Sequence, residues 1–208
     1  MKLLLTGFEP FGGSRVNPSE QVIHALSREK LNGVELHTAI LPVDRVRGPE
    51  TLIHAFEQHE PDAVLCLGEA SKRMAISIER VAINLMDYRI ADNIGNQATD
   101  EPIAADGPAA YFVTLPVRAM LNSVRAACVP TELSQSAGAF LCNQVTYSLL
   151  HYIAQNNLKN PTGFIHLPAL PEQVIDRDQV IPSMSLDTML QGIRAAIGAI
   201  KSSQEKNG

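Results

Sequence analysis

The sequence predicts an α/β fold in which helices cover both faces of a mainly parallel β-sheet. Apolar segments of strand length recur along the chain, and amphipathic segments of helix length separate them. This alternation is typical of parallel sheets, because the helix that connects two parallel strands packs against the sheet they form. The 208 residues contain no internal repeat and no linker-like stretch, and this length suits one domain. We therefore expect a single domain over residues 1–208.

The expected strands are apolar or alternating segments bounded by turn residues. KLLLTGF is an apolar run that ends in a turn, and DAVLCLG is typical of a buried strand. GVELHTAILPV alternates apolar and polar residues, and AISIERVAINL alternates in part, so each is expected to form one strand. With two later segments included, the expected strands are residues 2–8, 33–43, 62–68, 75–85, 131–138 and 161–170.

The expected helices each carry an apolar face, and two of them begin with a capping signal. Asn17 precedes Pro18 and is followed three residues later by Glu20, an arrangement close to a capping box. Ser185 is the expected cap of the closing helix. The expected helical segments are residues 17–26, 45–59, 115–128, 142–153 and 185–201.

Two segments carry no helix or strand pattern. Residues 86–108 are rich in Asp, Asn, Gly and Ala, and a run of this length without regular structure is uncommon inside a domain and often functional. An active-site flap, a hairpin and a subunit contact all remain open for it. Residues 203–208 are expected to form a disordered tail.

Composition and cysteine usage exclude several classes of protein. The net charge of −5 and the absence of a Lys/Arg cluster argue against a nucleic-acid partner. No apolar run approaches the length of a membrane span, and the N-terminus lacks the features of a signal peptide. The three cysteines form neither a CxxC pair nor a metal-ligand spacing, so no metal is expected. Their odd number predicts reduced thiols and a cytoplasmic location.

Cys142 is the only cysteine in a position that activates a thiol. It lies in SAGAFLCNQVTYSLLHY, where small residues precede a helical pattern. The N–H groups and the dipole at a helix start are expected to lower its pKa, and the same N–H groups can hold an oxyanion. The alternative is a small buried hydrophobic residue. Cys66, in a buried-strand pattern, is expected to be structural, and Cys128, at the end of a helical stretch, is expected to be inert.

Two further residues offer the partners that a nucleophilic cysteine needs. His166 stands near the end of the strand GFIHLP, and catalytic groups gather at the carboxyl ends of strands in open α/β sheets. Glu79 is a charge in an otherwise apolar strand pattern, and a buried carboxylate needs a partner. A histidine partner would complete a relay to the thiol, whereas a salt bridge to Arg80 or a solvated face would be structural.

The segment TGFEPFGG places a glycine-rich turn after the first strand. It lacks the GxGxxG spacing and the GK[ST] ending of phosphate-binding loops, so it indicates such a loop only weakly. Phe8 and Phe11 are more unusual, because aromatic residues make up only 5% of the chain. They are expected either to line an apolar pocket at the sheet edge or to belong to the core.

Four blocks together resemble the pyroglutamyl peptidases of type I, also called pyrrolidone carboxyl peptidases. The blocks are TGFEPFGG-(x3)-NPS, SIERVAINL-(x3)-R, SAGAFLCNQVTYSLLH and GFIHLPALPEQ, and they extend over almost the whole chain. The resemblance implies that Cys142 is the nucleophile, that His166 is the general base and acid, and that Glu79 orients His166. The candidate oxyanion and substrate-binding residues on these blocks are Arg89, Phe8, Phe11 and Asn17.

The resemblance also implies a fold, an activity and an assembly. The fold is an α/β/α sandwich with an open, twisted, mixed sheet, and the activity is hydrolysis of an N-terminal pyroglutamyl residue from peptides. No metal or cofactor takes part, and the chain forms a homo-oligomer, a tetramer or a dimer. One departure concerns GEASKR at residues 68–73, where members of the family often have GQAGGR, and it leaves the contacts of Glu69 open.

A function from another class also fits the pattern of elements. An α/β chain with a glycine-rich turn after its first strand suits a nucleoside phosphorylase-like transferase or a small-ligand-binding domain. Cys142 would be dispensable in either protein. Sensitivity to a thiol reagent therefore separates these functions from a cysteine peptidase.

Overall fold

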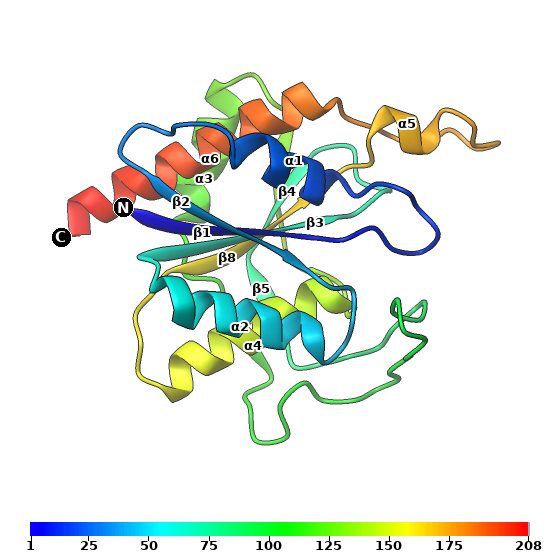
Figure 1. The fold of residues 1–208 in the computed structure, drawn as a ribbon, viewed down its shortest axis with the longest axis horizontal. Coiled ribbons are helices and arrows are strands. Elements are labelled where there is room, and N and C mark those ends of the chain that lie inside the picture. Colours follow the sequence, from blue (N-terminus) through cyan, green and yellow to red (C-terminus); the bar gives the residue numbers. More distant parts are fainter. Residues whose placement is uncertain (208) are drawn as a thin grey trace.

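The structure, a computed structural model that describes residues 1–207, is built on a six-stranded sheet (Figure 1). Its strands are β1 (Lys2–Phe8), β2 (Glu35–Leu41), β3 (Ala63–Glu69), β4 (Ile76–Glu79), β7 (Thr131–Ser134) and β8 (Thr162–Leu167). They lie in the order β2-β1-β3-β8-β4-β7. Neighbouring strands are parallel except β4 and β8, which are antiparallel. The prediction of a mixed, mainly parallel sheet is confirmed.

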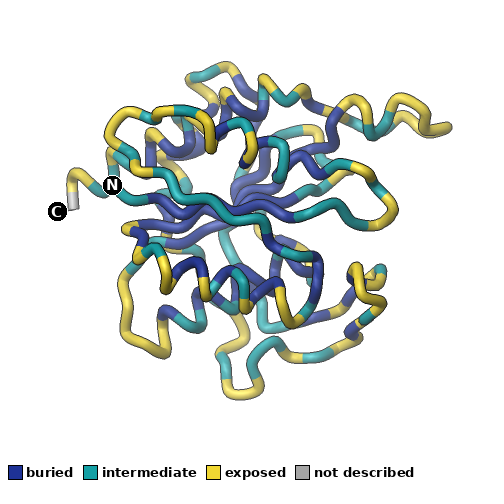
Figure 2. The backbone as a smooth tube through the Cα atoms, in the orientation of Figure 1, coloured by how far each residue is buried: buried dark blue, intermediate teal, exposed yellow. Residues whose placement is uncertain are grey.

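Helices cover both faces of the sheet, which confirms the expected α/β/α layers (Figure 1). Leu3 and Leu5 of β1 pack in one core cluster and Leu4 and Phe8 in the other, because successive side chains of a strand point to opposite faces. The buried residues concentrate in the strands and in the inner sides of the helices (Figure 2). The first cluster includes α1 (Pro18–Leu26), α3 (Val117–Ala126) and α6 (Leu186–Asn207), and the second includes α2 (Arg47–His59) and α4 (Leu141–Gln155).

Residues 75–85 form two strands in different sheets, so the expectation of one strand is wrong. β5 (Val81–Ile83) leaves the main sheet and pairs antiparallel with β6 (Ala110–Phe112), a strand that the sequence did not indicate. The chain changes partner at Arg80, which donates its backbone N–H to the carbonyl of Ser134 and accepts from the N–H of Val113. A switch of this kind depends on distant segments and leaves no mark in the local apolar pattern.

The segment from residue 86 to residue 108 forms no helix or strand, as expected, and yet it is anchored to the core. Met86 and Glu101 form an isolated bridge, and the N–H of Tyr88 donates to the carbonyl of Ala98 at 2.8 Å. Met86, Tyr88 and Ala98 are buried in the cluster beneath α2 and α4. The segment is therefore an irregular loop that packs apolar side chains into the core.

The closing helix is longer than the sequence indicated. α6 extends to Asn207, so residues 203–207 continue the helix and the expected tail is wrong there, while residue 208 lies outside the described residues. No Gly or Pro interrupts the chain between residues 199 and 207, and Lys201 and Glu205 form an i,i+4 pair at 3.7 Å. Within residues 1–207, no helix combines the length and apolar character that crossing a bilayer requires.

Candidate active site

A cavity of about 430 Å³ lies where the carboxyl ends of β1, β3 and β8 meet the beginning of α4. This is the edge at which open α/β sheets hold their ligands. The structure brings all seven sequence-predicted site residues to this place. Glu79 lies behind His166, within hydrogen-bond distance of it, and the other six line the cavity wall: Phe8, Phe11, Asn17, Arg89, Cys142 and His166.

Cys142 is the second residue of α4, as the sequence predicted. Phe140 precedes the helix in an extended conformation, and its side chain makes no capping hydrogen bond. The first-turn N–H groups of a helix have no partner within the helix. Without a side-chain cap, they remain available to a negatively charged oxygen beside the thiol.

Gly68 makes room for the sulfur above the sheet. It is the register partner of His166 on neighbouring parallel strands, so both residues present the same face of the sheet. A Cβ atom at this position would stand 2.8 Å from Sγ of Cys142 and 2.7 Å from the Phe164 ring. The bare backbone therefore leaves room for the thiol over the strand position that pairs with His166. Gly68 was not among the residues that the sequence pointed to, and its only signal there is a glycine at the end of a buried strand.

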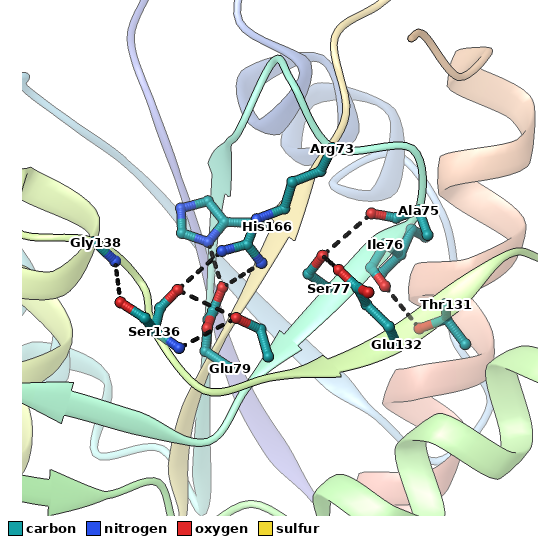
Figure 3. A network of polar contacts seen from close by, with 11 residues as sticks. Arg73, Ala75, Ile76, Ser77, Glu79, Thr131, Glu132, Ser136, Gly138 and His166 are labelled. Atoms are coloured by element: carbon teal, nitrogen blue, oxygen red, sulfur yellow. Dashed lines mark hydrogen bonds and ion pairs between the residues drawn. The ribbon is translucent and has the colours of Figure 1, made fainter.

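Glu79 and His166 form a buried hydrogen-bonded pair (Figure 3). Nδ1 of His166 lies 2.7 Å from Oε1 of Glu79, and the two residues are 4% and 1% exposed. A carboxylate only accepts hydrogen bonds, so Nδ1 carries the proton and Nε2 of a neutral ring is the free acceptor. Glu79 has a second partner in Arg73, whose Nη1 lies 2.7 Å from the same Oε1. The alternative of a salt bridge between Glu79 and Arg80 is not what the structure shows.

The electrostatics of the site differ from one sequence expectation. Burial raises the pKa of the Cys142 thiol to about 12, and the carboxylates of Glu79 and Glu69 act in the same direction. The expected lowering of this pKa by the helix start is therefore wrong, because desolvation outweighs it. Burial also lowers the pKa of His166, although Glu79 opposes that shift. Both shifts favour the uncharged thiol and the uncharged imidazole.

Aromatic rings form one wall of the cavity. Phe8, at the end of β1, is 3% exposed and belongs to the core cluster, whereas Phe11 is half-buried. The Phe11 ring lies 6.0 Å from that of Phe140, and the Phe140 ring contacts Tyr88 edge-on at 4.7 Å. The sequence analysis did not single out Phe140, although an aromatic residue two positions before Cys142, in a segment of small residues, was a usable signal.

Asn17 and Arg89 reach the cavity in different ways. Asn17 is fully buried, and its Oδ1 accepts from the N–H of Ser19 at 3.0 Å, which confirms it as the cap of α1. Its Nδ2 donates to the carbonyl of Glu9 at 3.0 Å. Arg89 is exposed on the cavity wall, on the irregular segment that follows β5. The polar atoms of Asn17 are thus already engaged, whereas Arg89 faces solvent.

The structure identifies the contacts of Glu69, which the departure at residues 68–73 had left open. Glu69 ends β3 and lines the cavity. Nε2 of Gln173 donates to both of its carboxylate oxygens, at 3.2 and 3.1 Å. Burial raises the pKa of this carboxyl. Gln173 belongs to α5 (Pro171–Val174), a four-residue helix that the apolar pattern did not reveal.

Comparison with known proteins gives consistent matches over the full length of the chain. Residues 1–203 match the family model described as pyroglutamyl peptidase. A pyrrolidone-carboxylate peptidase of Vibrio vulnificus (strain CMCP6) is 50% identical over 192 residues, which cover 92% of this chain and 89% of that protein.

Solved structures agree with these matches. The pyrrolidone carboxyl peptidase of Thermococcus litoralis superimposes with a TM-score of 0.95 at 37% identity and covers 100% of this chain and 96% of its own. A mutant pyrrolidone carboxyl peptidase of Pyrococcus furiosus gives 0.94 at 40% identity, over 98% of this chain and 100% of its own. With sequence and fold matched from end to end, the chain belongs to the pyroglutamyl peptidase family, whose members are cysteine peptidases that act on peptide bonds.

Proposed function

We propose that this protein removes an N-terminal pyroglutamyl residue from peptides, with Cys142 as nucleophile, His166 as general base and acid, and Glu79 as the group that orients His166. One observation carries the proposal: Sγ of Cys142 lies over Gly68, the register partner of His166, in the cavity that both residues line, and Nδ1 of His166 is held by a buried carboxylate. This is the order of nucleophile, base and orienting group that acyl transfer requires.

The uncharged resting state sets the first chemical step. Because the thiol and the imidazole are both neutral, Nε2 of His166 takes the thiol proton as Sγ attacks the pyroglutamyl carbonyl. The imidazolium that forms is stabilised by Glu79, and it then gives its proton to the leaving amine. A thioester remains on Cys142. Water attacks this thioester with His166 again as base, which releases pyroglutamate and restores the thiol.

The charge that develops on the carbonyl oxygen has two candidate partners. The N–H groups at the uncapped start of α4 lie beside Cys142, and preorganised donors of this kind stabilise a tetrahedral intermediate strongly. Arg89 on the cavity wall supplies a positive charge at the open side. We assign the helix N–H groups as the oxyanion site and Arg89 as an additional electrostatic contribution.

The cavity suits a small neutral ring better than an open amino acid. A lactam has no charge, and its apolar carbons can pack against Phe8 and Phe11 while its N–H and C=O find polar partners. An N-terminal glutamate would have to bury an ammonium group and a carboxylate in the same place. Taking each of these charges out of water costs roughly several kcal/mol. We therefore expect strong rejection of peptides that begin with glutamate.

A fluorogenic pyroglutamyl amide tests the proposal directly. Turnover should be abolished by iodoacetamide, and mass spectrometry of the alkylated protein should find the label on Cys142. The matching glutamyl amide should not be cleaved. Turnover that survives alkylation of Cys142 would contradict the proposal. Consumption of phosphate with a nucleoside, insensitive to the thiol reagent, would instead support the phosphorylase-like alternative.

We further propose that the protein works in the cytoplasm as a homo-oligomer, a tetramer or a dimer. Its three cysteines are free, and a free catalytic thiol needs a reducing compartment. Exposed apolar side chains such as Phe112, Ile175 and Val180 would be covered by a contact between copies. Light scattering on the purified protein tests the assembly, cell fractionation tests the location, and turnover that persists in EDTA tests the expectation that no metal takes part.

A further inference from the structure

The carboxylate behind His166 is held from two sides at one oxygen. Oε1 of Glu79 accepts from Nδ1 of His166 and from Nη1 of Arg73, each at 2.7 Å. Nη2 of Arg73 donates to the carbonyl of Ser136 at 2.9 Å (Figure 3). Arg73 therefore bridges the Glu79–His166 pair and the segment that precedes Cys142.

Resting on the function proposed above, we propose that Arg73 is a positioning residue of this site. Its guanidinium fixes the Glu79 carboxylate against His166 and ties the cavity wall before Cys142 to the same carboxylate. Arg73 lies six residues before Glu79, in the loop between β3 and β4. It does not need to touch the reacting atoms to have this effect.

The first support for this role is that the two carboxylate oxygens of Glu79 differ in their hydrogen bonds. The side chain is 1% exposed, and among the described residues its Oε2 has no hydrogen-bond partner. A buried carboxylate needs an opposite charge, and a neutral His166 supplies only a hydrogen bond. Arg73 supplies the charge. Without Arg73 nothing in residues 1–207 would hold the carboxylate plane except His166 itself, so either oxygen could face the ring.

The second support is the anchoring of the cavity wall. The carbonyl of Ser136 that accepts from Arg73 also accepts from Oγ of Ser134 at 3.1 Å, and Oγ of Ser136 accepts from the N–H of Gly138 at 3.1 Å. Ser136 and Gly138 line the cavity and lead into α4. A guanidinium has several donors in a rigid plane and can serve both acceptors at once, which a lysine ammonium does less well.

The charge of Arg73 also acts on the reacting groups. The charged groups that act on the two reacting residues are Glu79, Glu69 and Arg73, and Lys72 and Arg89 also line the cavity. Arg73 lowers the pKa of both Cys142 and His166, although burial is the larger cause for each. Removing its charge should therefore raise both pKa values. Protonated His166 would persist to higher pH, and the thiolate would form only at higher pH.

The test compares Arg73→Gln, Arg73→Lys and the control Arg80→Gln. Arg80→Gln removes the same charge one residue from Glu79, but its side chain does not line the cavity. Two quantities are measured over a range of pH: kcat/KM for a pyroglutamyl amide, and the rate at which iodoacetamide alkylates Cys142. Thermal unfolding of each variant is recorded in parallel.

If Arg73 has this role, each of the three variants should give a distinct result. Arg73→Gln should lower kcat/KM roughly ten- to hundredfold, by analogy with the loss caused by removing a residue that orients a metal ligand. In the same variant the acid limb of the kcat/KM profile and the alkylation profile should both move to higher pH. Arg73→Lys should keep these profiles near those of the wild type while its kcat/KM still falls. Arg80→Gln should match the wild type in both profiles.

Two results would overturn the proposal. One is an Arg73→Gln variant with wild-type profiles and wild-type kcat/KM. The other is a loss of activity in both Arg73 variants that only follows lost thermal stability, with neither profile displaced, because a purely structural arginine would behave in that way. The alkylation measurement needs no substrate, so it tests the role of Arg73 even if the wild type fails to cleave the amide. Such a failure would count only against the proposed function.

Discussion

Two helices begin beside the same cavity, and they differ in whether a side chain caps their first N–H groups. At the start of α1, Asn17 accepts from the N–H of Ser19, and Pro18 has no N–H to satisfy. At the start of α4, Phe140 offers no capping side chain. A missing cap costs about 1 kcal/mol of stability. The difference indicates that the α1 start stabilises the fold, whereas the α4 start keeps its donors free next to Cys142.

α4 can begin without a cap because other contacts hold it in place. Val145 and Leu149 are fully buried against the main sheet, and Tyr147 is fully buried in a smaller cluster with Ala82 of β5. Asn143, the residue after Cys142, is 1% exposed; its Oδ1 accepts from the N–H of Ile83 at 2.8 Å, and its Nδ2 donates to the carbonyl of the same residue at 2.9 Å. The helix start is thus fixed to β5 by a side chain that leaves the end of the helix open.

The largest expected effect comes from changing Cys142, the proposed nucleophile, at the uncapped start of α4. Cys142→Ser should fold normally and show no measurable turnover of a pyroglutamyl amide. A hydroxyl is much less acidic than a thiol, and a neutral His166 with a lowered pKa is a weak base for it. Far-UV circular dichroism together with the amide assay checks both parts of the expectation.

The other two cysteines serve as matched controls for that variant. Cys66 is fully buried in β3, and Cys128 is exposed after α3. Cys66→Ser and Cys128→Ser should both retain turnover, and Cys66→Ser should lose some stability because it buries a hydroxyl. Activity that survives in Cys142→Ser, or disappears in Cys128→Ser, would remove Cys142 from the role of nucleophile.

The next effect concerns pH and Glu79, the carboxylate proposed to orient His166. Burial lowers the pKa of His166 below its ordinary value of 6.5. We therefore expect kcat/KM to stay level at neutral pH and to fall only below about pH 6.5. At lower pH the ring takes up a proton and can no longer accept one from the thiol. Glu79→Gln should reduce the rate by up to about 10⁴-fold, the loss seen when the carboxylate of a serine triad becomes an amide.

Glu79→Gln should also displace the acid limb in a defined direction. Glu79 raises the pKa of His166 whereas Arg73 lowers it, so Glu79→Gln should move the acid limb to lower pH and Arg73→Gln should move it to higher pH. The pH profiles of the two variants measure this difference. A Glu79→Gln enzyme with wild-type rate and profile would show that another group orients His166.

The sequence predicts those parts of the site that local patterns encode. The helical stripe after Cys142 places it at the start of α4, and the apolar run before His166 places it near the end of β8. The catalytic roles of both residues stay predictions. Arg73 and Gly68 could not be found in this way, because their contacts join segments that are distant in sequence or paired across strands.

The same distinction explains the errors in the fold and in the electrostatics. The strand break at Arg80 depends on Ser134 and Val113, and the short helix α5 has too few residues for a periodic pattern. The pKa of Cys142 follows from how deeply the sulfur is desolvated and from two carboxylates brought near it by the fold. A local rule about helix starts contains neither quantity.

A smaller effect is expected at the aromatic wall. Phe11→Ala should raise KM about tenfold with little change in kcat, because stacking on a small ring is worth roughly 1–2 kcal/mol and acts on substrate and transition state alike. Phe8 is 3% exposed in the core, so Phe8→Ala should instead cost about 3–5 kcal/mol of stability. Kinetics and denaturant midpoints of both variants separate the two roles. An unchanged KM in Phe11→Ala would remove that ring from the substrate site.

The smallest expected effect comes from the capped helix start. Asn17→Ala should lower the free energy of unfolding by about 1–2 kcal/mol, because the N–H of Ser19 and the carbonyl of Glu9 both lose their partner. Asn17→Ser keeps a capping oxygen and should recover most of that loss. Neither variant should change KM more than a few-fold if the amide serves only α1. If KM rises strongly in both variants while Asn17→Ser keeps its stability, the Asn17 amide also binds the substrate. The start of α1 would then contribute to substrate binding, a function that we otherwise assign to the start of α4.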